Sequence, residues 1–97
     1  MSASLPVVQN FVHGRFLANS TGETFPVVNP ATGQVIYEVE VADESVQQAA
    51  IESARAGFAE WSAMTAIERS RILLRAVALL RERNDELAAA EVRDTGK

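Results

Sequence analysis

Few side chains in this sequence have the chemistry of a catalytic or metal site. The chain contains no cysteine and a single histidine, His13, which has no acidic residue beside it. Within this chain, a thiol nucleophile and a zinc site built on cysteine are therefore excluded. His13 precedes a glycine between two short apolar runs. A position in a tight hairpin turn explains this histidine better than a catalytic role does.

Three other groups of residues have both a functional and a structural interpretation. Gly96-Lys97 is similar to the end of a phosphate loop, but the first glycine of that motif is missing, so we expect a helix C-cap. Phe58 and Trp61 follow small residues at helical spacing, which favours a place in the core over stacking on a ligand. A set of arginines is interrupted by acidic residues, which favours a solvated helix face over a binding face: Arg69, Arg71, Arg75, Arg81 and Arg83.

Length and charge narrow the possible functions further. The 97 residues suffice for one small domain at most. The net charge of −4 provides no electrostatic footprint for nucleic acid or an anionic membrane. No apolar run approaches the roughly 20 residues of a membrane span, and residues 1–8 do not resemble a signal peptide. We therefore predict a cytoplasmic protein without nucleic-acid or membrane partners.

The hydrophobic content overstates the core that this chain can build. Hydrophobic residues make up 47% of the sequence, but 16 of them are alanines, which bury little area each. A chain of this size buries only roughly 60–65% of its unfolded surface. We therefore predict marginal stability in isolation and an apolar helix face that requires a partner.

The first half of the chain predicts short strands joined by turns. Residues 1–9 are expected to form a mobile tail, and residues 10–17 a hairpin. The best-specified turn lies within Phe25–Ile36, where Asn29-Pro30 starts the turn and Gly33 supplies a positive φ. Alternating apolar residues then predict a half-buried strand at 35–41.

The second half predicts helices with clear start and stop signals. Asp43 is a good N-cap for a first helix that ends around residues 61–64. Thr65 and Glu68 have capping-box spacing, which starts a second helix. The segment 84–86 either caps a third helix or kinks the second, and Gly96 is a natural C-terminal cap. Strands are thus expected at about 10–41 and helices at about 43–95.

The order of these motifs resembles the N-terminus of the aldehyde dehydrogenase superfamily. The resemblance extends from about Phe11 to Lys97, and within the superfamily it is closest to bacterial betaine-aldehyde dehydrogenases. It is carried by the hairpin at 11–16, the Val-Val-Asn-Pro-Ala-Thr-Gly segment at 27–33, the helical segments 64–73 and 80–88, and the closing Asp-Thr-Gly-Lys at 94–97.

The resemblance implies a fold class and a role. The chain would be an α+β N-terminal fragment of the α/β aldehyde dehydrogenase fold, with a hairpin and short strands followed by two or three helices. The complete enzyme would be a homo-oligomer that oxidises a small aldehyde with NAD or NADP. A catalytic cysteine, a general-base glutamate and the dinucleotide-binding sheet would all lie outside these 97 residues. The fragment would then be an inactive scaffold packed against the remainder of its subunit.

The resemblance also implies one ligand site that begins in this chain. Related enzymes bind a potassium ion inside the subunit through backbone carbonyls, at positions that match Val27, Val28 and Asp94. Carbonyl oxygens suit a weakly held monovalent cation, and side-chain identity then matters little. Pro26 departs from the polar residue expected before Val27. The alternative is that the two valines are ordinary strand residues and that Asp94 only ends a helix.

Three functions remain open from the sequence. The resemblance favours a betaine-aldehyde dehydrogenase, which would make glycine betaine. The same scaffold could act on another small aldehyde, such as a semialdehyde or an aminoaldehyde. A third possibility, from another class, is a non-catalytic module that binds a partner through its apolar helix faces.

Overall fold

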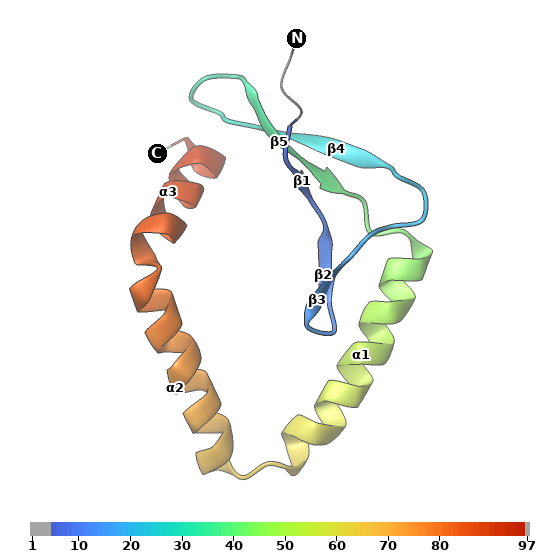
Figure 1. Cartoon of the computed structure of the whole chain (residues 1–97), viewed down its shortest axis with the longest axis vertical. Helices are drawn as coiled ribbons and strands as arrows, with labels where there is room; N and C mark the ends of the chain where they lie inside the picture. Colours follow the sequence, from blue (N-terminus) through green and yellow to red (C-terminus); the bar gives the residue numbers. More distant parts are fainter. Residues whose placement is uncertain (1–4, 97) are drawn as a thin grey trace.

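Five short strands precede three helices in this computed structural model, which describes residues 5–96 (Figure 1). The strands and helices are, in chain order, β1 (Val7–Val8), β2 (Asn10–Val12), β3 (Arg15–Leu17), β4 (Thr24–Val28), β5 (Val35–Glu40), α1 (Glu44–Ala63), α2 (Ala66–Glu82) and α3 (Asn84–Thr95). An α+β fold with strands first and helices after them is therefore confirmed.

The strands form a three-stranded sheet and a separate hairpin. The sheet has the order β1-β5-β4, with β1 parallel and β4 antiparallel to β5. The expected mobile tail at 1–9 therefore differs from the structure at Val7–Val8, which pair with Glu38 and Val39. Pro6 lacks an N–H, but its carbonyl still accepts a hydrogen bond of 3.0 Å from the Glu38 amide, which anchors this segment. Residues 1–4 of the expected tail lie outside the described residues.

Pro26 lies in the middle of β4, opposite Glu38. Hydrogen-bonded and non-hydrogen-bonded pairs alternate in an antiparallel ladder. The Val41 amide donates to the Glu23 carbonyl at 2.9 Å, which makes that pair a hydrogen-bonded one. Pro26 lies three positions after Glu23, so the alternation makes the pair of Pro26 and Glu38 a non-hydrogen-bonded one. The nitrogen of Pro26 therefore faces away from β5. The proline therefore costs the ladder no hydrogen bond, as expected of an edge strand.

Helix α1 packs against the β2–β3 hairpin. The turn of this hairpin has positive φ at both residues, 55° at His13 and 77° at Gly14, which confirms the expected two-residue turn. Phe11 and Phe16 lie opposite each other, with ring centroids 5.2 Å apart in an edge-to-face arrangement. At the start of α1, the Val46 side chain is buried and only 3% exposed.

The helix boundaries follow the capping signals of the sequence. Asp43 caps α1, and Thr65 with Glu68 forms both bonds of the capping box of α2. Between α2 and α3, Arg83 has φ −103° and ψ 18°, and no side chain caps α3. The Arg83 amide still donates to Leu79, and the Leu87 amide donates to Arg83. The structure therefore agrees with the second expectation for 84–86: α3 continues α2 after a kink at Arg83 and does not begin as a separately capped helix.

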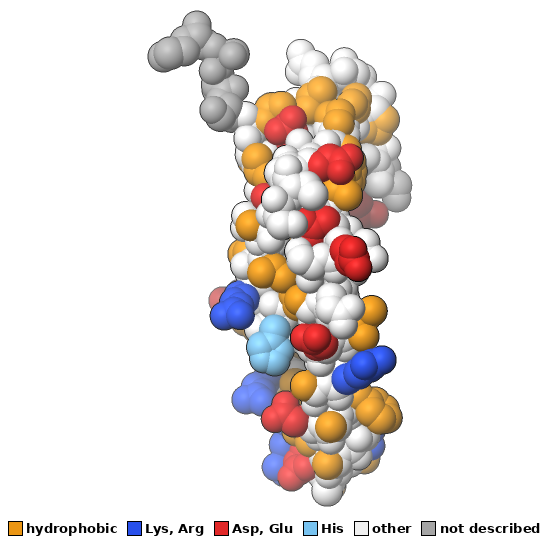
Figure 2. Space-filling model, turned by 90° about the vertical axis from the view of Figure 1, so that its right-hand side faces the viewer, with side chains coloured by type: hydrophobic (Ala, Val, Ile, Leu, Met, Phe, Trp, Pro, Cys, Tyr) orange, Lys and Arg blue, Asp and Glu red, His pale blue; other side chains and the backbone are white. Residues whose placement is uncertain are grey.

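Most large apolar side chains in the described range are exposed. Val46 is the one hydrophobic residue classed as buried between residues 5 and 96, whereas Phe58 is 73% and Leu74 64% exposed. The expected core position of Phe58 is therefore wrong for this chain, because no described element covers that part of α1. The radius of gyration is 17.2 Å, against roughly 13 Å for a compact domain of this length. Hydrophobic and acidic side chains are interspersed on the face shown in Figure 2.

This exposure predicts how the isolated chain behaves. We expect a broad, weakly cooperative thermal transition and strong binding of a hydrophobic dye, because apolar surface is left in water. Circular dichroism and dye fluorescence measure both properties. A sharp transition of a monomer above the mesophile range of roughly 45–65 °C would contradict the prediction.

Candidate functional site

The residues expected at a cation site lie around the β4–β5 turn and the end of α3. Val27 pairs with Tyr37 and Val28 with Val35, and the register shifts between the two valines. Such a shift disrupts the ladder locally and changes the direction of backbone groups. The expected carbonyl ligands therefore lie at an irregular position of the sheet rather than in an unbroken strand.

The turn between these strands is held by its own residues. The Asn29 side-chain oxygen accepts from the Ala31 amide at 2.9 Å, and the Asn29 carbonyl accepts from the Thr32 and Gly33 amides at 3.2 and 2.8 Å. Gly33 has φ 74°, which returns the chain to the extended run of β5. The turn chemistry predicted from Asn29, Pro30 and Gly33 is confirmed, and it fixes the position of the two valines just before it.

The last turn of α3 meets this sheet at two places. The Tyr37 hydroxyl donates to Asp94 Oδ1 at 2.6 Å. Gly96 has φ 76°, and a Cβ atom added there would lie 2.8 Å from Pro30 Cγ and 3.2 Å from the Ala31 nitrogen. Figure 1 shows the end of α3 beside the β4–β5 loop, opposite the loop that joins α1 to α2. Segments about 60 residues apart in sequence are thus brought together.

The bond between Tyr37 and Asp94 changes the acid–base chemistry of the phenol. The hydrogen bond to the Asp94 carboxylate raises the pKa of Tyr37 above its ordinary value of 10.0, and the negative charge of Asp94 adds to this effect. Arg93 acts in the opposite direction. The phenol therefore stays protonated and remains a donor at neutral pH.

This region contains oxygen atoms suited to a monovalent cation. Val28 falls at a non-hydrogen-bonded position, because the Asn29 amide donates to the Gln34 carbonyl in the next pair. Its carbonyl thus faces the outer edge of β4. The Tyr37 hydroxyl donates to Asp94 Oδ1, and the other carboxylate oxygen, Oδ2, accepts no hydrogen bond from any described residue. An outward carbonyl and an unbonded carboxylate oxygen fit a hard cation better than a soft one.

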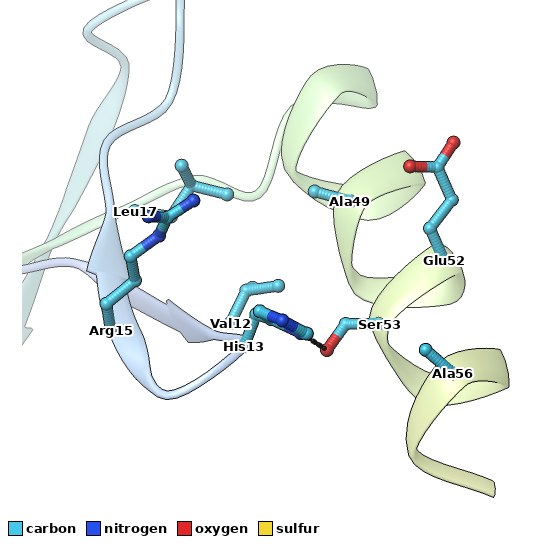
Figure 3. Close-up of a pocket in the computed structure, with 8 residues that line it drawn as sticks. All are labelled: Val12, His13, Arg15, Leu17, Ala49, Glu52, Ser53 and Ala56. Atoms are coloured by element: carbon cyan, nitrogen blue, oxygen red, sulfur yellow. Dashed lines mark hydrogen bonds between the residues drawn. The ribbon is translucent and has the colours of Figure 1, made fainter. Parts of the chain in front are cut away.

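A second candidate is the groove between the hairpin and α1. It has a volume of about 290 Å³ and is lined by Val12, His13, Arg15, Leu17, Ala49, Glu52, Ser53 and Ala56 (Figure 3). A hydrogen bond of 3.0 Å joins His13 Nδ1 to the Ser53 hydroxyl. The Glu52 carboxylate points away from the imidazole, so it does not orient this pair. The geometry supports packing of the hairpin on α1 rather than nucleophilic catalysis, which needs an oriented base.

A third hollow lies where α1 meets α2. Its volume is about 410 Å³, and its walls are mainly apolar: Trp61, Ala66, Arg69, Ser70, Leu73, Leu74 and Val77. Arg69 and Ser70 are the polar residues of this wall. No acidic residue accompanies them, so the hollow has the composition of a packing surface.

Residues 5–96 lack two features: a cluster of metal-binding side chains and a membrane-spanning helix. This range contains no group of three or more histidine, cysteine, aspartate or glutamate side chains placed to hold a metal ion. Nor does it contain a helix with the length and apolar character needed to cross a membrane.

Sequence reasoning missed the contribution of Tyr37 to this region. Its alternation with Val35 and Val39 indicated only a shared strand face, and nothing nearby in sequence pointed to α3. Asp43 was predicted as a helix cap, but its bonds to the Ser20 amide and hydroxyl, at 2.6 and 2.7 Å, were not predicted. In both cases the partner lies more than 20 residues away.

Known proteins match this chain along nearly its whole length. The profile of the aldehyde dehydrogenase family matches residues 16–97. Betaine aldehyde dehydrogenases from two strains of Vibrio vulnificus, YJ016 and CMCP6, are each 53% identical over 93 residues. The match covers 96% of this chain and 19% of each relative, so the chain spans about a fifth of their length.

Solved structures agree with this chain in fold. A putative methylmalonate-semialdehyde dehydrogenase from Sinorhizobium meliloti, solved in complex with NAD, matches 95% of the chain at 32% identity with a TM-score of 0.87. HpcC from Thermus thermophilus matches 95% at 36% identity with a TM-score of 0.89. The match covers 19% and 18% of those two proteins. The profile match and the shared fold together place this chain in the aldehyde dehydrogenase family.

Proposed function

We propose that this chain is the N-terminal scaffold of an NAD(P)-dependent dehydrogenase that oxidises betaine aldehyde to glycine betaine. The observation that carries the proposal is the 53% identity to betaine aldehyde dehydrogenases over 93 of the 97 residues. The exposed apolar faces of α1 and α2 fit a segment that packs against the rest of a larger subunit. A cytoplasmic homo-oligomer is the form we propose for the complete enzyme.

The chemistry of the reaction would come from residues outside this chain. Aldehyde oxidation through a covalent intermediate needs a thiolate, and this chain has no cysteine. When bound, NAD or NADP accepts the hydride that leaves the substrate carbon. The residues of this chain would contribute the sheet, the helical arm formed by α2 and α3, and the contacts that hold both in place.

We further propose that Val27, Val28 and Asp94 take part in binding a potassium ion. The backbone carbonyls of Val27, Val28 and Asp94 would supply ligands, the second carboxylate oxygen of Asp94 would add one, and the remaining ligands would come from outside the chain. Support comes from the register shift at the valines and from the hydrogen bond that places Asp94 against β5.

A second candidate function is oxidation of a semialdehyde. The fold matches a putative methylmalonate-semialdehyde dehydrogenase with a TM-score of 0.87, and an aminoaldehyde is a further alternative. A non-catalytic interaction module would use the same exposed helix faces. The three functions differ in whether a complete enzyme forms and in which aldehyde it prefers.

Activity measurements separate these functions. The 97-residue chain alone should form no NADH from betaine aldehyde, because it has no thiol nucleophile. A chimera should be active when this chain replaces the matching segment of the Vibrio vulnificus betaine aldehyde dehydrogenase. In the chimera, NADH absorbance with betaine aldehyde reports whether an active enzyme assembles. In the same assay, the complete protein that contains this chain should prefer betaine aldehyde over a semialdehyde and an aminoaldehyde.

Three results would contradict the proposal. Turnover by the isolated chain above background would show that its scaffold role is wrong. A chimera that fails to assemble would favour the interaction module, provided that the unmodified Vibrio protein assembles under the same conditions. A preference of the complete protein for a semialdehyde would select the second candidate.

A further inference from the structure

Tyr37 occupies a fixed position between the two parts of the candidate cation site. It lies in β5, the central strand of the sheet, with Val27 directly opposite it in β4. The neighbouring Glu38 amide donates to the Pro6 carbonyl on the other side of β5, so the backbone beside Tyr37 is held from both edges. A central strand is the least mobile place from which a side chain can reach another element.

From this strand, the Tyr37 side chain reaches the last turn of α3. The 2.6 Å bond from its hydroxyl to Asp94 Oδ1 is a charge-assisted hydrogen bond, because the acceptor is an ionised carboxylate. Donation to Oδ1 also orients the carboxylate and leaves Oδ2 without a described partner. The same residue thus faces Val27 through its backbone and holds Asp94 through its side chain.

The helical arm formed by α2 and α3 has few other contacts with the sheet. Its apolar residues are largely exposed, among them Leu73, Leu74 and Leu80, so packing does not fix its orientation. The approach of Gly96 to Pro30 is a second contact at the same end of the arm. The position of Asp94 relative to the valines therefore depends on bonds made at this end.

We propose that Tyr37 is the positioning residue of the cation site, and that its hydroxyl holds Asp94 in register with the backbone of Val27 and Val28. This inference rests on the potassium site proposed above. Tyr37 itself does not contact the ion in this arrangement. It acts through Asp94, as residues behind metal ligands commonly do.

The test uses the Vibrio vulnificus chimera that carries this chain, with two readouts that do not depend on turnover. The first is the potassium concentration that gives half of the maximal rise in thermal stability, at constant ionic strength with choline as the replacing cation. The second is hydrogen exchange of the peptide that covers the last turn of α3. Tyr37→Phe removes only the hydroxyl and keeps the ring.

We expect Tyr37→Phe to raise the half-maximal potassium concentration roughly tenfold, in line with the loss of other groups that orient metal ligands. Exchange in the last turn of α3 should become faster in the same variant. Asp94→Asn removes the negative charge, so it should weaken potassium binding. Because it keeps an acceptor for the Tyr37 hydroxyl, it should affect exchange in the last turn of α3 less than Tyr37→Phe does. Thr24→Val, which removes a hydroxyl at the start of β4, should change neither readout.

The outcomes distinguish this inference from the function on which it rests. If potassium does not stabilise the unsubstituted chimera, the cation site is wrong, and the inference about Tyr37 is wrong with it. If potassium stabilises the chimera but Tyr37→Phe leaves the half-maximal concentration unchanged, the site stands and the positioning role is overturned. If the chimera does not assemble, potassium titration and exchange on the complete protein that contains this chain decide by the same criteria.

Discussion

Replacing Gly96 with valine should detach the last turn of α3 from the β4–β5 turn. Gly96 has φ 76°, a conformation that residues with a Cβ rarely adopt, and the added atom would lie 2.8 Å from Pro30 Cγ. A β-branched residue in this backbone conformation costs roughly 1–3 kcal/mol before the steric conflict with Pro30 is counted. Both effects oppose the folded position of the helix end, so we expect the largest loss of stability of any single glycine replacement in this chain.

Urea unfolding followed by circular dichroism measures this loss, and hydrogen exchange locates it. Gly57→Ala is the matched control, because Gly57 lies within α1 and a Cβ atom there would meet no atom within 4 Å. That control should stabilise the chain by roughly 0.5–1 kcal/mol through helix propensity. Equal stability of Gly96→Val and the unsubstituted chain would show that α3 does not close against the Pro30 turn.

Replacing Asp43 with alanine should loosen the junction between the sheet and α1. One carboxylate oxygen accepts from the Ser20 amide and hydroxyl, and the other accepts from the Ser45 hydroxyl at 2.7 Å and the Val46 amide at 3.1 Å. Alanine leaves all four donors without this acceptor. We expect the thermal midpoint to fall on the order of 5 °C, with lower helix content.

The same carboxylate makes stability sensitive to acid. Hydrogen bonds from the side chain of Ser20, then from Ser45 and two backbone amides, hold the pKa of Asp43 well below its ordinary value of 3.8. Because the folded pKa is the lower one, this contribution is complete above the unfolded pKa and is lost as pH falls below about 4. Asp43→Ala should therefore flatten the pH dependence of unfolding between about pH 4 and pH 2.

A matched acid elsewhere in α1 separates capping from general charge effects. Glu60→Ala removes an acidic residue from the last turns of the same helix, where a negative charge opposes the helix dipole. It should leave stability unchanged or slightly higher. If Asp43→Ala and Glu60→Ala behave alike across this pH range, the bonds to Ser20 and Val46 do not stabilise the junction.

Features encoded within a few residues were predictable from the sequence. The His13-Gly14 turn, the Asn29-Pro30 turn and the caps at Asp43 and Thr65 depend on side chains that bond their own neighbours. Their signals are therefore complete in a short window. The α+β order of the chain was predictable for the same reason, since apolar periodicity changes from two to about 3.6 residues after residue 41.

Features that join distant segments were not predictable in this way. The parallel pairing of Val7 with Glu38 connects segments about 30 residues apart, and no local signal selects that partner. The expectation of a buried Phe58 followed from helical periodicity, which identifies an apolar face but not whether another element covers it.

The candidate site also combines residues that were predicted from short motifs with contacts that only the fold reveals. Val27, Val28 and Asp94 entered through the resemblance of short motifs to a family, whereas the bond between Tyr37 and Asp94 required the fold. The turn at Asn29 was predicted from its residue types, but its contact with Gly96 was not, since it depends on where the kinked arm ends.

The position of Pro26 makes the three-stranded sheet asymmetric in its capacity to grow. The outer edge of β4 has no donor at its centre, so a further strand cannot form a continuous ladder there. At the opposite edge of the sheet, neither residue of β1, Val7 or Val8, is a proline, so both have a backbone N–H. Pro26 therefore disfavours extension of the sheet across β4. This one residue thus opposes pairing of the β4 edge with any further strand, whether from the same chain or from a second copy.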